Sequence, residues 1–128
     1  MNLWQFIKDN MKHHLQQTVS EGKVEKTYEE IIDFAEQFSK QLKGIKCCAI
    51  LCQSELTAAM ALLGCFAARV TAVPLSQRYG ELHCNKILDS ISPQAVITDQ
   101  NGELNILRVE EFGYIEPKVH PALIMCTS

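Results

Sequence analysis

The chain has 128 residues, of which 47% are apolar and 21% charged, and its net charge is −3 with a pI near 5.8. This length fits one domain, and the balance of apolar and charged residues excludes a disordered chain. The acidic charge excludes the basic surface that nucleic acids and anionic membranes attract, so we expect neither as a partner.

All six cysteines lie in apolar segments, and no signal peptide precedes them: Cys47, Cys48, Cys52, Cys65, Cys84 and Cys126. We interpret them as reduced, buried thiols of a cytoplasmic protein, and their spacing matches no zinc site. The longest apolar stretch, 58–68, has 11 residues, whereas a membrane-spanning helix needs about 20. The sequence therefore predicts no membrane anchor.

The first part of the chain predicts a helix, a hairpin and a second helix. Asn2 can cap a one-sided helix whose apolar residues recur at helical spacing: Leu3, Phe6, Ile7, Met11 and Leu15. Residues 18–26 alternate around Glu21-Gly22, which indicates a small hairpin. Thr27 and Glu30 then form a capping box. The helix that follows should bury Ile31, Ile32, Ala35, Phe38 and Leu42 and end at Gly44.

Strands and helices alternate from there on. Residues 47–52 are apolar throughout, as in a strand covered on both faces. Ser54 can cap a third helix, which is apolar nearly all round. The further elements follow in chain order: helix 55–68, strand 70–75, helix 80–91, strand 95–98, a short strand 104–109 and a final strand 122–126.

This order predicts an α/β fold, in which a parallel-rich sheet carries helices on both faces, with an N-terminal helix and a small hairpin added. We expect residues 1–128 to form a single subdomain. Ligands of such sheets bind where the parallel strands end. Those ends are Gln53-Ser54, residues 76–78, Asp99 and Thr127-Ser128.

Motifs of several common enzyme classes do not occur in the chain. We find no G-x-G-x-x-G, no G-x-x-x-x-G-K-[ST] and no G-x-S-x-G, which excludes a dinucleotide fingerprint, a P-loop and a nucleophile elbow. We therefore assign no catalytic residue and no metal ligand. A flavodoxin-like domain stays open as an alternative, with flavin binding by Ser54 and Thr57, whereas a receiver domain would need acidic residues after strand 47–52.

Three stretches, in this order, resemble the acyl-adenylate-forming enzymes, which include acyl-CoA synthetases, peptide-synthetase adenylation domains and luciferases. Residues 27–31, TYEEI, are similar to the family's Thr-Tyr-x-Glu-Leu helix start. Residues 70–75, VTAVPL, are similar to Ala-Val-x-Val-Pro-Leu and lead into 78–82, RYGEL, which favours acyl- or aryl-CoA ligases. Residues 122–128, ALIMCTS, resemble the strand before the Thr-Ser-Gly-Thr-Thr-Gly phosphate loop.

The resemblance implies an ATP- and Mg-dependent ligase that activates a carboxylic acid as an acyl-adenylate and passes it to the thiol of CoA or a carrier protein. Thr127 and Ser128 match the first two loop positions, so the resemblance makes them ATP-binding residues of an incomplete loop. We expect this chain to be truncated within the loop, and therefore to be inactive and unable to bind ATP on its own. Its expected partner is the remainder of the enzyme. Without that partner we expect the chain to self-associate through exposed apolar surface.

Two positions depart from the family's pattern. Arg69 stands where members commonly have glycine, and 44–47, GIKC, replaces the usual Gly-Asp before the first strand. A non-glycine residue at position 69 costs about 1 kcal/mol or more if the helix ends in the left-handed conformation.

The alternative function is a stand-alone, non-catalytic interaction or regulatory domain. The one-sided first helix would serve as its contact surface for a partner.

Overall fold

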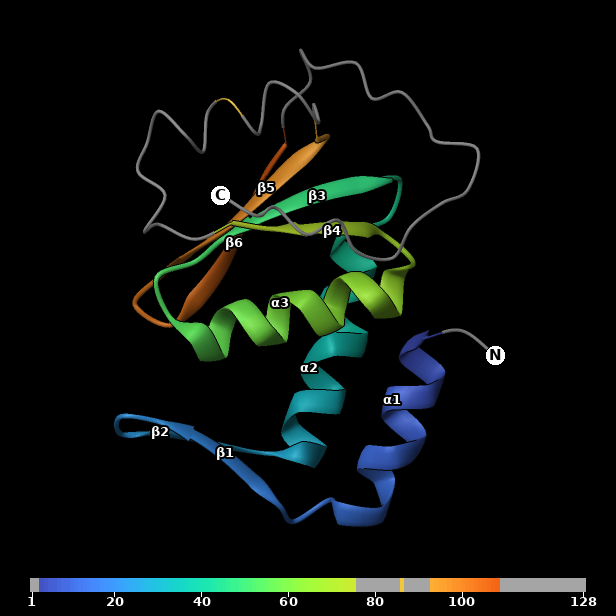
Figure 1. Ribbon diagram of the computed structural model, residues 1–128, viewed down its shortest axis with the longest axis vertical. Helices are drawn as coiled ribbons and strands as arrows, with labels where there is room; N and C mark the ends of the chain where they lie inside the picture. The colour runs from blue at the N-terminus through green and yellow to red at the C-terminus, as the bar shows by residue number, and fades with distance from the viewer. Residues whose placement is uncertain (1–2, 76–85, 87–92, 109–128) are drawn as a thin grey trace.

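The computed structural model describes residues 3–75, 86 and 93–108, and Figure 1 shows their arrangement. A two-stranded hairpin extends from one side of a helical layer, and a four-stranded sheet lies against the other side. The predicted helix 80–91, the final strand 122–126 and the sites at 76–78 and 127–128 lie outside these residues, apart from Lys86, which is helical.

The four-stranded sheet has the order β4-β3-β5-β6. Strand β3 (Cys47–Leu51) runs parallel to both β4 (Thr71–Pro74) and β5 (Ala95–Gln100). Strand β6 (Glu103–Arg108) returns antiparallel to β5 through Asn101 and Gly102, whose positive φ angles suit a tight hairpin turn. The predicted α/β fold with a parallel-rich sheet is confirmed.

Two helices, α2 (Tyr28–Gln41) and α3 (Glu55–Ala68), cover one face of the sheet (Figure 1). Cys48 and Ile50 of β3 point to this face, because alternate residues of a strand lie on the same side. Cys47 and Ala49 point to the opposite face and are also fully buried. Both faces of the central strand are thus covered, as its continuous apolar sequence predicts.

The predicted capping boxes and helix stops are largely confirmed. Thr27 Oγ1 accepts a hydrogen bond from the Glu30 N–H (3.1 Å), and Glu30 Oε1 accepts one from the Thr27 N–H (3.0 Å). Helix α2 buries the side chains that its spacing predicts, which are Ile31, Ile32, Ala35, Phe38 and, just after its end, Leu42. Gly44 follows with a φ of +86°, a conformation that favours glycine.

Helix α1 (Leu3–Met11) packs on α2 and α3 with a face that agrees only in part with the predicted one. Trp4 is buried against Ile32, Ala35 and Phe66, and Ile7 and Met11 pack beside it. Leu3 and Phe6 are 44% and 57% exposed, and Leu15 is 36% exposed. The prediction is confirmed for Ile7 and Met11 and wrong for Leu3, Phe6 and Leu15. Burial of the large Trp4 ring turns its own side of the helix inward, and Phe6 lies about 200° away from it. Leu15 lies beyond the end of α1.

The hairpin of β1 (Thr18–Glu21) and β2 (Val24–Thr27) is confirmed, with Gly22 at its turn in a positive φ conformation. Every residue of β1 is exposed. Packing of apolar side chains therefore does little to hold the hairpin, and polar contacts to α3 become important.

Candidate functional site

Strands β3 and β5 end side by side, because they are parallel neighbours with Leu51 opposite Thr98. The residues that follow each strand therefore meet at one edge of the sheet, as the sequence predicts. Gln53 and Ser54 leave β3 and begin α3, and Asp99 stands near the end of β5. This meeting point is the candidate site.

The Asp99 carboxylate binds the start of α3. Its Oδ1 accepts a hydrogen bond from the Gln53 N–H (2.8 Å), and its Oδ2 accepts one from the Ser54 N–H (3.0 Å). The hydroxyl of Thr57, which is itself buried, donates to Oδ2 at 2.6 Å. The aspartate thus joins two neighbouring strands and a helix through three donors.

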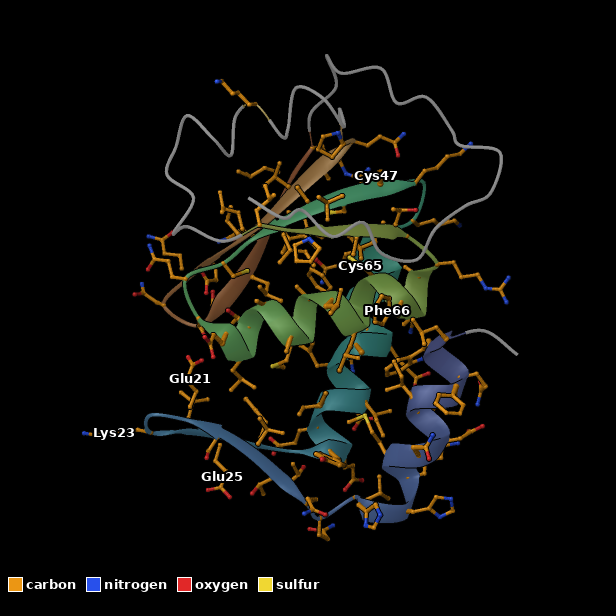
Figure 2. All side chains as sticks on the ribbon, in the orientation of Figure 1. Glu21, Lys23, Glu25, Cys47, Cys65 and Phe66 are labelled. Carbon is orange, nitrogen blue, oxygen red and sulfur yellow. The ribbon has the colours of Figure 1, made fainter. Side chains whose placement is uncertain are left out.

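A second carboxylate reaches the same helix start from far away in the sequence. Glu21, at the end of β1, accepts hydrogen bonds from the Ser54 hydroxyl (2.6 Å) and the Leu56 N–H (3.0 Å). Figure 2 shows Glu21 pointing from the hairpin toward α3, whereas Lys23 and Glu25 point away from it. Sequence reasoning missed this contact, since Glu21 had only been placed at a turn.

These hydrogen bonds favour the ionised form of both carboxyl groups. Burial acts to raise the pKa of Asp99, but the donors on Gln53, Thr57 and Ser54 together outweigh burial and lower that pKa. The Ser54 hydroxyl and the Leu56 N–H lower the pKa of Glu21. Negative charge at a helix start is also favoured by the helix dipole. The two carboxylates therefore act as caps that hold α3 in place.

The start of α3 is the part of the described structure that most resembles an anion site, and its own carboxylates already use it. Ser54 also caps the helix by accepting from the Thr57 N–H at 3.2 Å. Flavin binding by Ser54 and Thr57, the alternative that the sequence left open, is therefore contradicted: both side chains are engaged and a flavin phosphate would meet Asp99 and Glu21.

The described cysteines are free thiols, and Cys47, Cys48 and Cys65 are buried as predicted, whereas Cys52 is only partly buried. Burial raises the pKa of Cys47 and of Cys52 to about 11 in each case. A hydrogen bond with the Cys65 thiol raises the pKa of Cys48, and burial adds to the increase. Thiols with raised pKa values are poor nucleophiles, so these side chains serve the core. Cys84 and Cys126 lie outside the described residues.

Among residues 3–75, 86 and 93–108, no group of three His, Cys, Asp or Glu side chains is placed to hold a metal ion. None of the helices in this part of the chain is long and apolar enough to cross a bilayer.

No protein-family model matches the sequence, and no curated protein is detectably similar to it. Solved structures are similar in fold. IdnL1 superposes over 95% of this chain and 30% of its own, with a TM-score of 0.71 and 18% identity. The N-terminal subdomain of Klebsiella oxytoca NpsA matches over 78% of this chain and 28% of its own, with a TM-score of 0.68 and 16% identity.

The adenylation domain AlmE of Vibrio cholerae, solved in complex with glycyl-adenosine-5'-phosphate, matches over 77% of this chain and 20% of its own, at 21% identity and a TM-score of 0.64. The chain thus spans less than a third of the length of each of these three structures. It has the fold of the N-terminal portion of adenylation domains and acyl-CoA or AMP ligases.

Proposed function

We propose that this chain is the N-terminal part of an ATP-dependent acid–thiol ligase, which activates a carboxylic acid as an acyl-adenylate and passes the acyl group to the thiol of CoA or a carrier protein. The observation that carries the proposal is the fold match, which covers 95% of this chain against IdnL1. The bound ligand of AlmE, glycyl-adenosine-5'-phosphate, is itself an acyl-adenylate. The three sequence stretches that resemble this family point the same way.

In this proposal residues 1–128 belong to one subdomain, and Thr127 and Ser128 are the first two residues of the phosphate loop. Such a loop holds the phosphates of ATP through backbone amides and hydroxyls while charge moves to the leaving pyrophosphate. In this proposal the described residues do not hold the phosphates, since Asp99 and Glu21 already occupy the start of α3. Their part is to support the remainder of the enzyme, which binds ATP and Mg.

Carboxylate-dependent exchange of labelled pyrophosphate into ATP tests the isolated chain. With a panel of aliphatic, aromatic and amino acids we expect no exchange above the protein-free control, because residues 1–128 supply only the first two positions of the proposed loop. Exchange that depends on both the chain and an acid would contradict the predicted inactivity.

The proposed parent family is tested separately by the DNA downstream of the Ser128 codon. We expect a coding sequence that continues Gly-Thr-Thr-Gly, directly or after a frameshift. A downstream region without any such coding sequence counts against the ligase and favours a stand-alone domain.

A stand-alone interaction domain is the second candidate, and one observation favours it. Helix α1 leaves Phe6 57% exposed on the side that faces away from α2 and α3, where a partner protein could contact it. The association state of the purified chain distinguishes the two candidates, because a stand-alone domain gives a monomer or one defined oligomer.

A further inference from the structure

A pocket of about 290 Å³ lies between α2, α3 and the β5–β6 turn, and it shares Thr57 with the carboxylate-capped start of α3. Its apolar wall comes from Phe34 and Phe38 of α2, Met60 of α3 and Leu104 of β6. The volume is close to the lower end of ligand pockets, which begin at about 300 Å³. It therefore suits a small molecule better than a large cofactor.

The apolar wall suits a flat aromatic ring, because it combines aromatic side chains with a flexible methionine. The rings of Phe34 and Phe38 are stacked, with centroids 5.4 Å apart and planes 14° apart. Phe38 and Met60 are buried at 4% and 8% exposure, so they form the inner part of the pocket. The Met60 thioether is polarisable and unbranched, which allows it to adapt to an aromatic ligand.

The polar groups of the pocket favour a cation. Glu103 is exposed and lines the pocket with a carboxylate that has no ion-pair or hydrogen-bond partner within the described part of the chain. Thr57 also lines it, with its hydroxyl committed to the Asp99 carboxylate behind it. The nearby Arg108 guanidinium is held on the Gln41 carbonyl oxygen at 3.2 Å, so an ammonium group would avoid that end and lie at Glu103.

We propose that this pocket binds a small aromatic amine, with the ring against Phe38 and Met60 and the ammonium group at the Glu103 carboxylate. The site lies entirely within described elements and does not depend on the proposed ligase activity, so the two proposals can fail separately.

The test uses the full chain labelled with ¹³C at its methionine methyl groups and titrated with 2-phenylethylammonium. We expect a saturable shift of the Met60 methyl signal and none of the Met11 signal, because Met11 packs with α1. Phenylacetate has a similar ring with the opposite charge, and we expect it to bind more weakly by about two- to fivefold, the range of an exposed ion pair.

A variant removes the charge without altering the core. Glu103→Gln should weaken binding of the amine by about two- to fivefold and bring it level with phenylacetate. Glu25→Gln, at an equally exposed carboxylate on β2, should leave both affinities unchanged. A Met60 signal that does not move, or an amine preference that survives in Glu103→Gln, overturns the proposal.

Discussion

Arg69 ends α3 in the left-handed conformation, with φ at 59° and ψ at 38°. An L-residue pays a steric penalty there, because its Cβ approaches the neighbouring carbonyl oxygen, and glycine does not. Its N–H still closes the helix on the carbonyl oxygens of Cys65 and Phe66. The departure from the family's glycine that the sequence shows at this position is therefore a local source of strain.

Replacing Arg69 tests this strain against the charge of the side chain. Arg69→Gly should raise the free energy of unfolding by about 1 kcal/mol relative to Arg69→Ala, since both variants remove the guanidinium and only glycine relieves the backbone. Urea unfolding followed by circular dichroism measures the difference. Equal midpoints for the two variants would show that the left-handed conformation carries no penalty here.

The carboxylate caps at Glu21 and Asp99 predict how stability depends on pH. Their pKa values are lowered in the folded state from ordinary values of 4.5 and 3.8. A group with a lowered folded pKa stabilises the protein above its unfolded pKa and loses that contribution as the pH falls through the folded value. The caps are therefore at full strength at pH 7 and weaken below about pH 4.

Asp99→Asn should lower the urea midpoint at pH 7 and make the midpoint fall less between pH 5 and pH 3 than in the unaltered chain. The neutral amide keeps the shape but cannot accept from the Gln53 N–H, the Ser54 N–H and the Thr57 hydroxyl with both atoms. Glu25→Gln serves as the control at a carboxylate that points away from α3. An unchanged acid dependence in Asp99→Asn would mean that the cap contributes nothing.

At the scale of elements, the sequence predicted the features that depend on residue type and on spacing along the chain. The capping box at Thr27, the covered strand β3 and the parallel neighbours of β3 all follow from residue type and spacing. The predicted inward face of α1 was partly wrong, because periodicity alone does not show that Trp4 is buried in preference to Phe6. The Glu21 cap could not be predicted either, because its partner Ser54 is 33 residues away and the approach of the hairpin depends on tertiary packing.

Helices α2 and α3 approach closely at Gly64, which has no side chain to separate them. A Cβ added there would lie 2.6 Å from Cδ2 of Phe38, which is closer than real contacts allow. Because Phe38 is 4% exposed and packed in the core, it has little room to move. The crossing of the two helices thus depends on this glycine.

Gly64→Ala should destabilise the protein by about 1–3 kcal/mol, although alanine is the better helix former. Thermal and urea unfolding of Gly64→Ala, Phe38→Leu and the double variant form a mutant cycle. We expect the double variant to be more stable than the sum of the single effects, because the smaller side chain at position 38 frees space for the new methyl group. If the effects of the two substitutions on stability are additive, the destabilisation by Gly64→Ala does not come from its contact with Phe38.

For the whole molecule, apolar side chains are buried in some regions and left exposed in others. The helix-covered face of the sheet is closed by a continuous core that includes Ile50, Leu42 and Ile97. Large apolar side chains remain exposed elsewhere, on α1, between α1 and the hairpin, on the hairpin and on β6, and these are Leu3, Phe6, Leu15, Val19, Val24 and Leu107. If the chain is one part of a larger enzyme, such surface would be covered in the intact protein.

The exposed apolar surface predicts how the isolated chain associates in solution. As part of a ligase it should self-associate without a fixed stoichiometry, so its weight-average mass from light scattering should rise steadily with concentration. Phe6→Ser should reduce the rise, because Phe6 is 57% exposed on α1, whereas Asn10→Ser on the same helix should not. A stand-alone interaction domain would instead give a monomer or one defined oligomer at all concentrations. A constant mass, unaffected by Phe6→Ser, would therefore contradict the ligase proposal's account of this surface and favour an independent domain.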